Sequence, residues 1–453
     1  MRITLLPRFP GRGAVARAHF GARAALLCAT LATPLAAQPP ATGTAAELYP
    51  DAHGATRPAA VRELCDDLQR LLRGYGPRAR LGVLVVSLER GDTLFSHNAD
   101  ALLSPASNAK LFSTAAALYY LGAAYRFTTE VRARGELKDG VLRGDLVLRG
   151  TGDPTLGSPR FAGTARALAA LADSVAALGV REVQGDLVGD ASFFDAERFG
   201  PGWEWYDRLA WYGPPVGALS FAENLRAGAR PVDDPAAYTL AAFGRSLRER
   251  GVRVRGRTRV EHAARATGPE RLLATHVSPP LAEVARVTNH VSHNLYAEAL
   301  LKEVGRVVTG EGSFAAGARA VEAFLARAAG VDTAHAVRLV DGSGLSRTNR
   351  VTPRATVELL GFMAREGGAE PFLASLPSAG SERGLRRMFG TAAAGALRAK
   401  TGTLKDVSAL SGYVHAADGE RLAFSLIANA VASTAEAKRL EDRVGARLAE
   451  FRR

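Results

Sequence analysis

The stretch Pro105-Ala106-Ser107-Asn108-Ala109-Lys110-Leu111 begins a helix that has almost no polar side. From Asn108 to Leu121 the residues are apolar nearly all round, and Gly122 then supplies a typical stop signal. A helix without a face for water is buried, so we predict that this one lies inside its domain. Lys110 follows Ser107 by three residues, and one helical turn therefore brings its amine beside the hydroxyl.

Lysine is rare in this chain, which makes the position of Lys110 informative. After residue 37 there are 6 lysines and 47 arginines, so arginine supplies positive charge wherever charge alone is needed. Arginine stays protonated at any useful pH, whereas a buried lysine near another cation has a lowered pKa and can act as a base. We therefore predict that Lys110 accepts the proton of Ser107 and that Ser107 is a nucleophile.

Two further motifs follow Ser107 along the chain. Ser292-His293-Asn294 comes directly before a predicted helix, and Lys400-Thr401-Gly402-Thr403 lies in a strand-like stretch. Such a strand can pair with an extended peptide; its glycine allows close approach, and its lysine and first threonine can face a carboxylate. The order Ser-x-x-Lys, Ser-x-Asn, Lys-Thr-Gly matches the signature of serine β-lactamases and penicillin-binding proteins.

With these motifs in order, the chain resembles the D-alanyl-D-alanine carboxypeptidase/endopeptidase family, the low-molecular-mass penicillin-binding proteins with a long insertion between the first two motifs. The resemblance covers nearly all of the chain after residue 37, and the middle segments separate this family from β-lactamases. Besides the three motifs, the matching segments are Gly152-Asp153-Pro154-Thr155-Leu156, Gly185-Asp186-Leu187-Val188-Gly189-Asp190, Asn294-Leu295-Tyr296-Ala297-Glu298 and Asp341-Gly342-Ser343-Gly344-Leu345-Ser346.

The resemblance implies a role for each motif residue. Ser107 would form an acyl-enzyme with Lys110 as its base, and the second motif would supply Ser292 for catalysis and Asn294 for substrate binding. The oxyanion would lie on the backbone N–H groups of Ser107 and Thr403. The substrate-binding strand would consist of Lys400, Thr401, Gly402 and Thr403.

The positions of the predicted strands indicate an insertion. A hairpin over Leu81–Phe95 and three late strands, over 399–403, 407–414 and 422–428, can share one sheet only if the middle of the chain is inserted between them. The predicted fold class is therefore α/β (α+β), with a β-lactamase/transpeptidase-like domain whose antiparallel sheet is flanked by helices, plus a smaller inserted α+β domain. The predicted ranges are 44–125 and 274–453 for the catalytic domain and 126–273 for the insertion.

One family feature is expected to be missing. The interval between Ser107 and Ser292 is shorter than is usual in the family, and the shortening falls after Ser220-Phe221-Ala222-Glu223-Asn224. We therefore expect that the third small domain of the family is absent.

Several residues near the motifs are predicted to have supporting roles only. His293 is interpreted as a histidine at the pocket rim, and Asp341-Gly342-Ser343-Gly344 as a loop lining the cleft. Cys65 shares an apolar helix face and is expected in the core, and the mature chain has no second cysteine for a disulfide. The chain shows neither a metal-binding nor a phosphate-binding motif, so no metal and no cofactor are predicted.

The first 37 residues have the order of an export signal. Five arginines and no acid precede a short apolar run, and small residues then lead to a predicted cleavage site near Ala37. The run is too short to cross a bilayer, although an uncleaved interfacial anchor stays an alternative. The remaining chain has a net charge of +8 with dispersed arginines, which suits an anionic envelope surface better than nucleic acid. The predicted location is the periplasm, without a transmembrane segment after processing.

The predicted function is that of a periplasmic serine-type D-Ala-D-Ala carboxypeptidase/endopeptidase. Its partners would be peptidoglycan stem peptides as substrates and β-lactam antibiotics as acylating inhibitors. Two alternatives stay open: a serine β-lactamase with the same motifs but fast deacylation, and an inactive envelope scaffold that has retained the fold.

Overall fold

The computed structural model describes residues 58–75, 78–164, 166–263, 269–365 and 369–453. The predicted signal peptide, residues 1–37, lies outside the described residues, as do residues 44–57 of the predicted catalytic domain. All of the described residues belong to one compact unit, residues 40–453.

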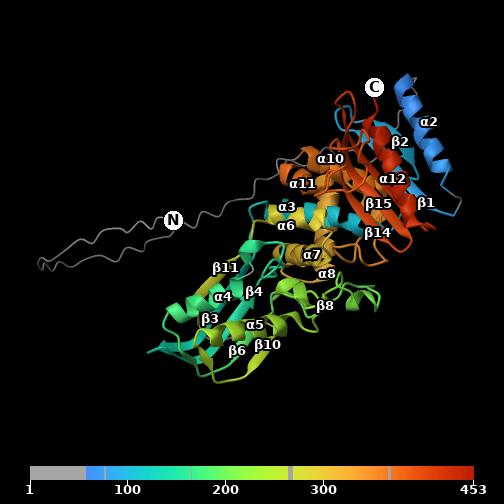
Figure 1. Ribbon diagram of the computed structural model, residues 1–453. Helices are drawn as coiled ribbons and strands as arrows, with labels where there is room; N and C mark the ends of the chain where they lie inside the picture. The colour runs from blue at the N-terminus through green and yellow to red at the C-terminus, as the bar shows by residue number, and fades with distance from the viewer. Residues whose placement is uncertain (1–57, 76–77, 165, 264–268, 366–368) are drawn as a thin grey trace, which may run out of the picture. The chain divides into compact units, whose positions relative to one another are not determined.

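A five-stranded antiparallel sheet joins the two ends of the described chain (Figure 1). Val85 of the first strand lies opposite Phe424 of the last, so the predicted pairing of the early hairpin with the late strands is observed. In sheet order the strands are β14 (Leu397–Leu404), β15 (Val407–His415), β16 (Arg421–Asn429), β1 (Arg80–Ser87) and β2 (Thr93–His97).

Both faces of this sheet are covered, which explains why β1 reads as a continuous apolar run. Leu84 and Val86 point into one hydrophobic cluster and Val83 and Val85 into another, as the twofold alternation of a strand requires. Helix α10 (Pro353–Arg365) packs on one face, and the other face carries α2 (Ala59–Arg73) and α12 (Thr434–Ala449). Cys65 of α2 is partly buried there and donates to the carbonyl of Leu94 at 3.0 Å.

Helix α3 (Ala109–Leu121) is the central helix of the larger cluster. Residues 109–118 are all buried, as the apolar sequence predicts. Its neighbours are other helices of the same cluster, so the residues at its N-terminus are fixed by packing from several sides. These neighbours are α6 (Leu281–His290), α7 (Asn294–Thr309), α8 (Phe314–Phe324) and α11 (Ala369–Ser375).

A second, seven-stranded sheet is built from the middle of the chain. Helices α4 (Ala167–Ala177) and α5 (Pro235–Glu249) pack against its strands around a separate hydrophobic cluster. We propose that this sheet and its two helices are the inserted domain; β11 ends at Val277, a few residues beyond the predicted boundary. The main strands in sheet order are β10 (Thr258–Glu261), β6 (Leu187–Asp190), β4 (Val141–Gly150), β3 (Thr128–Lys138) and β11 (Glu270–Val277), and β5 (Glu182–Val183) and β9 (Arg253–Val254) extend from β4.

A short hairpin occupies the position where the third small domain of the family is expected to be missing. Strands β7 (Leu225–Arg226) and β8 (Arg230–Pro231) pair there and lead directly into α5. The remaining short elements are α9 (Thr333–Ala336) and the strand pair β12 (Val337–Arg338) and β13 (Arg350–Val351). Among the residues that the structure describes, no helix combines the length and apolar character needed to cross a membrane.

Candidate active site

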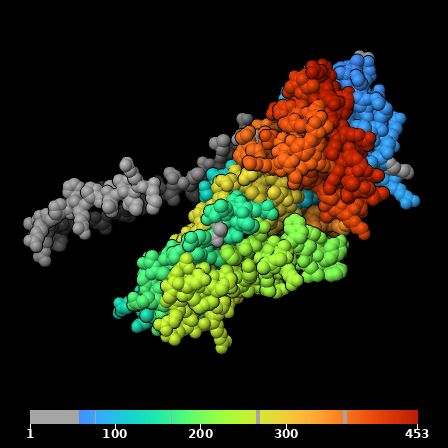
Figure 2. Space-filling model, viewed as in Figure 1, coloured from blue at the N-terminus to red at the C-terminus, as the bar shows by residue number. Residues whose placement is uncertain are grey.

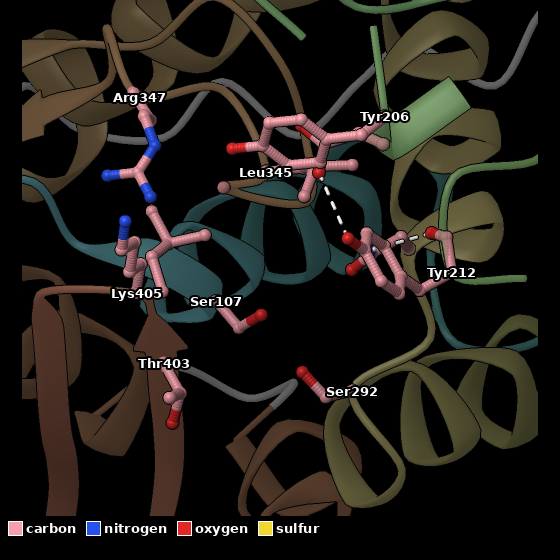
Figure 3. A pocket seen from close by; sticks show the side chains of 12 residues that line it. Ser107, Tyr206, Tyr212, Ser292, Leu345, Arg347, Thr403 and Lys405 are labelled. Carbon is pink, nitrogen blue, oxygen red and sulfur yellow. Dashed lines mark hydrogen bonds between the residues drawn. The ribbon is translucent and has the colours of Figure 1, made fainter. Parts of the chain in front are cut away.

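A pocket with a volume of about 520 Å³ brings the three sequence motifs together (Figure 3). Ser107 lies in the turn before α3, Ser292 and Asn294 lie at the start of α7, and Thr403 belongs to β14. In Figure 3 the hydroxyls of Ser107 and Ser292 face the same space. The lining residues are Ser107, Tyr206, Asp207, Tyr212, Ser292, Asn294, Gly344, Leu345, Arg347, Thr403, Leu404 and Lys405.

The amine of Lys110 has three oxygen partners in a fully buried position. Its Nζ lies 2.9 Å from Ser107 Oγ, 2.6 Å from Asn294 Oδ1 and 2.7 Å from the carbonyl oxygen of Ser343. The Asn294 amide is oriented by its other end, because its Nδ2 donates to the Tyr212 carbonyl at 2.9 Å. The network therefore presents the amide oxygen, rather than the amide nitrogen, to Lys110.

Burial changes the protonation of this amine. It lowers the pKa of Lys110 to about 7, although the nearby carboxylates of Glu298 and Asp341 favour the charged form. An amine with such a pKa is partly neutral at neutral pH and can accept a proton. The direction of the shift is the one expected from the apolar helix in the sequence.

A second lysine connects β14 with the second motif. Lys400 Nζ lies 3.0 Å from Ser292 Oγ and 2.8 Å from the carbonyl oxygen of Thr401. The side chain is buried, and burial together with the charge of Lys110 lowers the pKa of Lys400 well below its ordinary value. The two lysines and the two serines thus form two amine–hydroxyl pairs at one pocket.

The other residues of the Lys-Thr-Gly-Thr motif lie along β14. Thr403 lines the pocket, whereas Thr401 is half-buried and its side chain is not among the lining groups. At Gly402 a Cβ atom would lie 2.6 Å from the carbonyl oxygen of Pro105, so this glycine lets β14 approach the turn that carries Ser107. The expected close approach at Gly402 is thus to the protein's own backbone.

Strained backbone lies beside both pocket serines. Ala106, directly before Ser107, has φ of 46°, and Ser292 itself has φ of 58°. Such values are uncommon for residues with a side chain, and they persist where the surroundings force them. Gly344 lets its loop pack directly against this turn, because a Cβ there would lie only 1.8 Å from the Ala106 carbonyl oxygen. The serines are therefore held by tight packing.

The loop Asp341-Gly342-Ser343-Gly344 lines the pocket through Gly344, in agreement with the sequence interpretation. It also has a role that the sequence analysis missed, since the Ser343 carbonyl accepts from Lys110. The carboxylate of Glu298 fixes the loop by accepting from the N–H groups of Gly342 at 2.7 Å and Ser343 at 3.0 Å. Burial and the charge of Asp341 raise the pKa of Glu298 to about 8, despite these bonds and the charge of Lys110.

The interpretation of His293 as a pocket-rim residue is wrong. Its side chain is only 10% exposed and is not among those that line the pocket; its Nε2 lies 3.1 Å from Glu223 and its ring packs against that of Tyr296. Burial lowers the pKa of His293, so the neutral ring can donate this bond. The partner acid could not be recognised locally, because Glu223 comes from the middle of the chain.

Glu223 is a buried charge that joins the middle segment to the second motif. Ser158 Oγ donates to it at 2.7 Å and Arg160 pairs with it at 3.1 Å. Burial alone favours its neutral form, but the bonds from His293 and Ser158 and the charge of Arg160 lower the pKa of Glu223 to about 2. The acid stands in a left-handed turn, with φ of 56° at Glu223. Glu223 therefore holds His293, the residue after Ser292, in place and does not itself line the pocket.

No group of three or more metal-ligating side chains occurs within the described ranges. Close to Ser107 the site offers the Ser292 hydroxyl, two low-pKa amines, the Asn294 amide and backbone groups. This set is suited to nucleophilic attack by a serine whose proton moves to an amine.

Comparison with known proteins decides the family. The model of the D-Ala-D-Ala carboxypeptidase 3 (S13) family matches residues 64–227 and 217–451. The chain belongs to this S13 family. A D-alanyl-D-alanine carboxypeptidase of Actinomadura sp. (strain R39) is 35% identical over 87% of this chain and 86% of its own length. The D-alanyl-D-alanine carboxypeptidase DacB of Haemophilus influenzae is 25% identical over 76% of this chain and 84% of its own length.

Solved structures agree with this S13 assignment at the level of the fold. Penicillin binding protein 4 of Haemophilus influenzae matches with a TM-score of 0.76 at 23% identity, over 85% of this chain and 100% of that chain. A predatory peptidoglycan endopeptidase from Bdellovibrio bacteriovorus matches with a TM-score of 0.53 at 16% identity, over 83% of this chain and 94% of that chain. The predicted fold class is confirmed. This S13 protein is a serine-type D-alanyl-D-alanine carboxypeptidase, as the motif resemblance indicated.

Proposed function

We propose that this S13 carboxypeptidase removes the terminal D-alanine from peptidoglycan stem peptides through an acyl-enzyme on Ser107, and that it also cuts D-alanine-containing cross-links. The observation that carries the proposal is the set of three partners around Lys110 Nζ. A relative whose name includes peptidoglycan endopeptidase shares the fold, which supports the second activity.

The partners of Lys110 suit a neutral amine that faces Ser107. A neutral amine has two N–H donors and one lone pair. Asn294 Oδ1 and the Ser343 carbonyl can only accept, so they take the two N–H groups. The lone pair is then left for the hydroxyl hydrogen of Ser107, whose oxygen lies 2.9 Å away.

The acylation step follows from that arrangement. Ser107 Oγ attacks the carbonyl carbon of the D-Ala-D-Ala bond while its proton moves to Lys110 Nζ. The peptide C–N bond then breaks, the leaving amine takes up a proton, and free D-alanine departs. Water cleaves the resulting ester, and Ser107 regains its proton. The backbone N–H groups of Ser107 and Thr403 are proposed to hold the oxyanion.

Ser292 and Lys400 are proposed to act on the departing D-alanine, by supplying a proton to its amine and a positive charge to its carboxylate. Ser292 Oγ faces the pocket and lies 3.0 Å from Lys400 Nζ, so this hydroxyl can pass a proton to the departing amine. Arrival of a substrate carboxylate at β14 favours the protonated form of Lys400, because an opposite charge raises a lowered amine pKa. Asn294, Thr401, Gly402 and Thr403 would position the peptide.

The periplasm is the proposed site of action. The basic and apolar order of residues 1–37 supports export, and the positive charge of the remaining chain suits an anionic cell envelope. Peptidoglycan stem peptides are accessible in that compartment.

Product masses from defined muropeptides test the proposal. The chain from residue 38 onward should release one alanine from a pentapeptide stem and divide a cross-linked dimer, and Ser107→Ala should do neither. An unchanged pentapeptide with the wild-type protein contradicts the carboxypeptidase activity. That result would favour the inactive scaffold if penicillin also failed to label Ser107.

We further propose that penicillins acylate Ser107 and that the adduct persists. Asp207 is the carboxylate among the pocket-lining residues, and both of its oxygens are engaged, by the Glu204 N–H at 3.0 Å and the Tyr212 hydroxyl at 3.1 Å. It is therefore poorly placed to activate a deacylating water. Intact-protein mass spectrometry should show one stable drug adduct that is lost in Ser107→Ala, whereas fast turnover without an adduct would indicate a β-lactamase.

A further inference from the structure

The loop from Gly200 to Gly213, here called the aromatic loop, carries all three tryptophans of the chain. Two of them lie in water: Trp205 is 72% and Trp211 is 61% exposed, and Leu209 between them is 69% exposed. Figure 2 shows the green surface to which this loop contributes. Single exposed apolar residues are ordinary, but three large ones in one loop mark an interaction surface.

The aromatic loop is held in place by buried polar contacts. Trp203, its buried tryptophan, donates from Nε1 to Asp341 Oδ2 at 2.9 Å, which ties the loop to the pocket wall. Asp207 closes the loop from within, because it accepts from the Glu204 N–H and the Tyr212 hydroxyl. The exposed rings are thus presented by a fixed backbone, which reduces the entropy lost on binding.

The exposed tryptophans lie outside the active-site pocket, next to two of its lining residues. Tyr206 and Tyr212 line the pocket, and each has an exposed tryptophan packed against it. The Trp205 and Tyr206 rings lie 6.1 Å apart at 79°, and the Trp211 and Tyr212 rings lie 5.8 Å apart at 83°. Both geometries are edge-to-face, the stable arrangement for aromatic pairs. An aromatic surface therefore runs from the pocket outward into solvent.

We propose that Trp205 and Trp211 stack on sugar rings of the glycan strand to which the stem peptide is attached. The inference rests on the proposed function, since a stem peptide bound at Ser107 continues out of the pocket toward its glycan. A pyranose ring presents C–H groups on its faces, and these are attracted to the electron-rich face of an indole. Its hydroxyls lie at the ring edge, where polar side chains such as Glu204 can reach them.

The charges of the loop favour a sugar over a lipid surface. Segments that dock on anionic membranes combine apolar residues with many lysines and arginines. Here the exposed rings are accompanied by one exposed acid, Glu204, and by one arginine, Arg208, because Asp207 is buried. The guanidinium of Arg208 lies 5.2 Å from the centre of the Phe199 ring and is thus engaged by the protein itself.

The test is the double variant Trp205→Leu/Trp211→Leu, which keeps apolar area but removes both indole faces. Phe389→Leu is the matched control, because Phe389 is 51% exposed and does not line the pocket. Hydrolysis is compared on a free pentapeptide and on the same pentapeptide attached to a tetrasaccharide of the glycan. Binding to glycan strands stripped of their peptides by an amidase is measured in parallel.

The double variant should lose about 10-fold in kcat/KM on the glycan-linked peptide, mostly through KM, which corresponds to about 1.4 kcal/mol for the aromatic contacts. On the free peptide and in penicillin acylation it should match wild type. Binding to stripped glycan should fall by a similar factor, and the Phe389→Leu variant should behave as wild type throughout.

Three outcomes would overturn the inference. Equal losses on both peptides would mean that the tryptophans only shape the pocket. If the double variant kept the wild-type ratio of kcat/KM between the two peptides and bound stripped glycan as wild type does, the proposed sugar contact would be refuted. Binding of wild type to phosphatidylglycerol vesicles but not to glycan strands would assign the loop to a membrane. If the wild-type enzyme hydrolysed neither peptide, the proposed function would fail, and the stripped-glycan binding would still decide whether the tryptophans bind sugar.

Discussion

The two large sheets place their positive charges in different surroundings. At the edge of the five-stranded sheet, Lys110 and Lys400 are buried, and within the described part of the chain neither forms an ion pair. On the seven-stranded sheet, Arg134, Arg149 and Arg259 are partly exposed and pair with acids of other strands in the same sheet. Burial lowers the pKa of both lysines, whereas hydrogen bonds to Glu261 and Asp186 raise that of Arg259.

The different surroundings give the arginines and the lysines different roles. An arginine among carboxylates stays charged and contributes to the surface of a domain. A lysine among neutral oxygens can give up its proton, which is what a general base requires. Lys110 and Lys400 therefore differ chemically from these arginines, and the following substitutions test that difference.

The largest effect is expected for Lys110→Arg. The substitution keeps a positive charge but removes the group that can accept the Ser107 proton. Loss of a general base costs roughly 10²–10⁴-fold, so penicillin acylation should slow by about that factor. Stopped-flow measurement with a fluorescent penicillin gives the rate, and circular dichroism checks the fold. A variant that acylates nearly as fast as wild type would remove Lys110 from the base role.

A smaller loss is expected for Lys400→Arg. If Lys400 mainly supplies charge to a substrate carboxylate, arginine retains the charge and part of the activity, although its planar fork places the donors differently. We expect a loss of about 10-fold, equivalent to ~1.4 kcal/mol and seen mainly in KM for a pentapeptide substrate. Equal and severe losses in both lysine variants would mean that Lys400 takes part in removing the Ser107 proton as well.

The smallest effect is expected for Arg149→Ala on the seven-stranded sheet. Arg149 pairs with Asp190 at 2.7 Å and with Glu270 at 3.0 Å, but about a third of its side chain is exposed. Solvent-screened pairs contribute ~0.2–1 kcal/mol, so urea unfolding should show a loss of that size that shrinks in high salt. Acylation should be unchanged. Slower acylation in this variant would contradict the purely structural role assigned to this arginine.

Much of the fold could be predicted because its signals are local. The apolar run before Ser87, the hairpin after it and the three late strands each show their pattern within about ten residues. The motifs at Ser107, Ser292 and Lys400 could likewise be placed at one site, since their order along the chain is distinctive. The structure brings all three to one pocket.

What the sequence could not show depends on contacts between distant segments. Glu223 and His293 meet across 70 residues, and Trp203 and Asp341 across 138. No periodic pattern reports such pairs. A usable signal existed in Glu298, an acid inside an otherwise apolar stretch of helix, because a buried charge requires partners. The same reasoning applies to Glu223, which follows an apolar segment.

The pH dependence of acylation tests most directly whether Lys110 acts as a neutral base. Below its pKa the amine is protonated and cannot accept the Ser107 proton, so the second-order rate constant for penicillin should increase about tenfold per pH unit and level off above about 7. In Lys110→Arg this inflection should disappear. A wild-type rate that is flat between about pH 5 and 8, or an unchanged inflection in Lys110→Arg, would contradict the account.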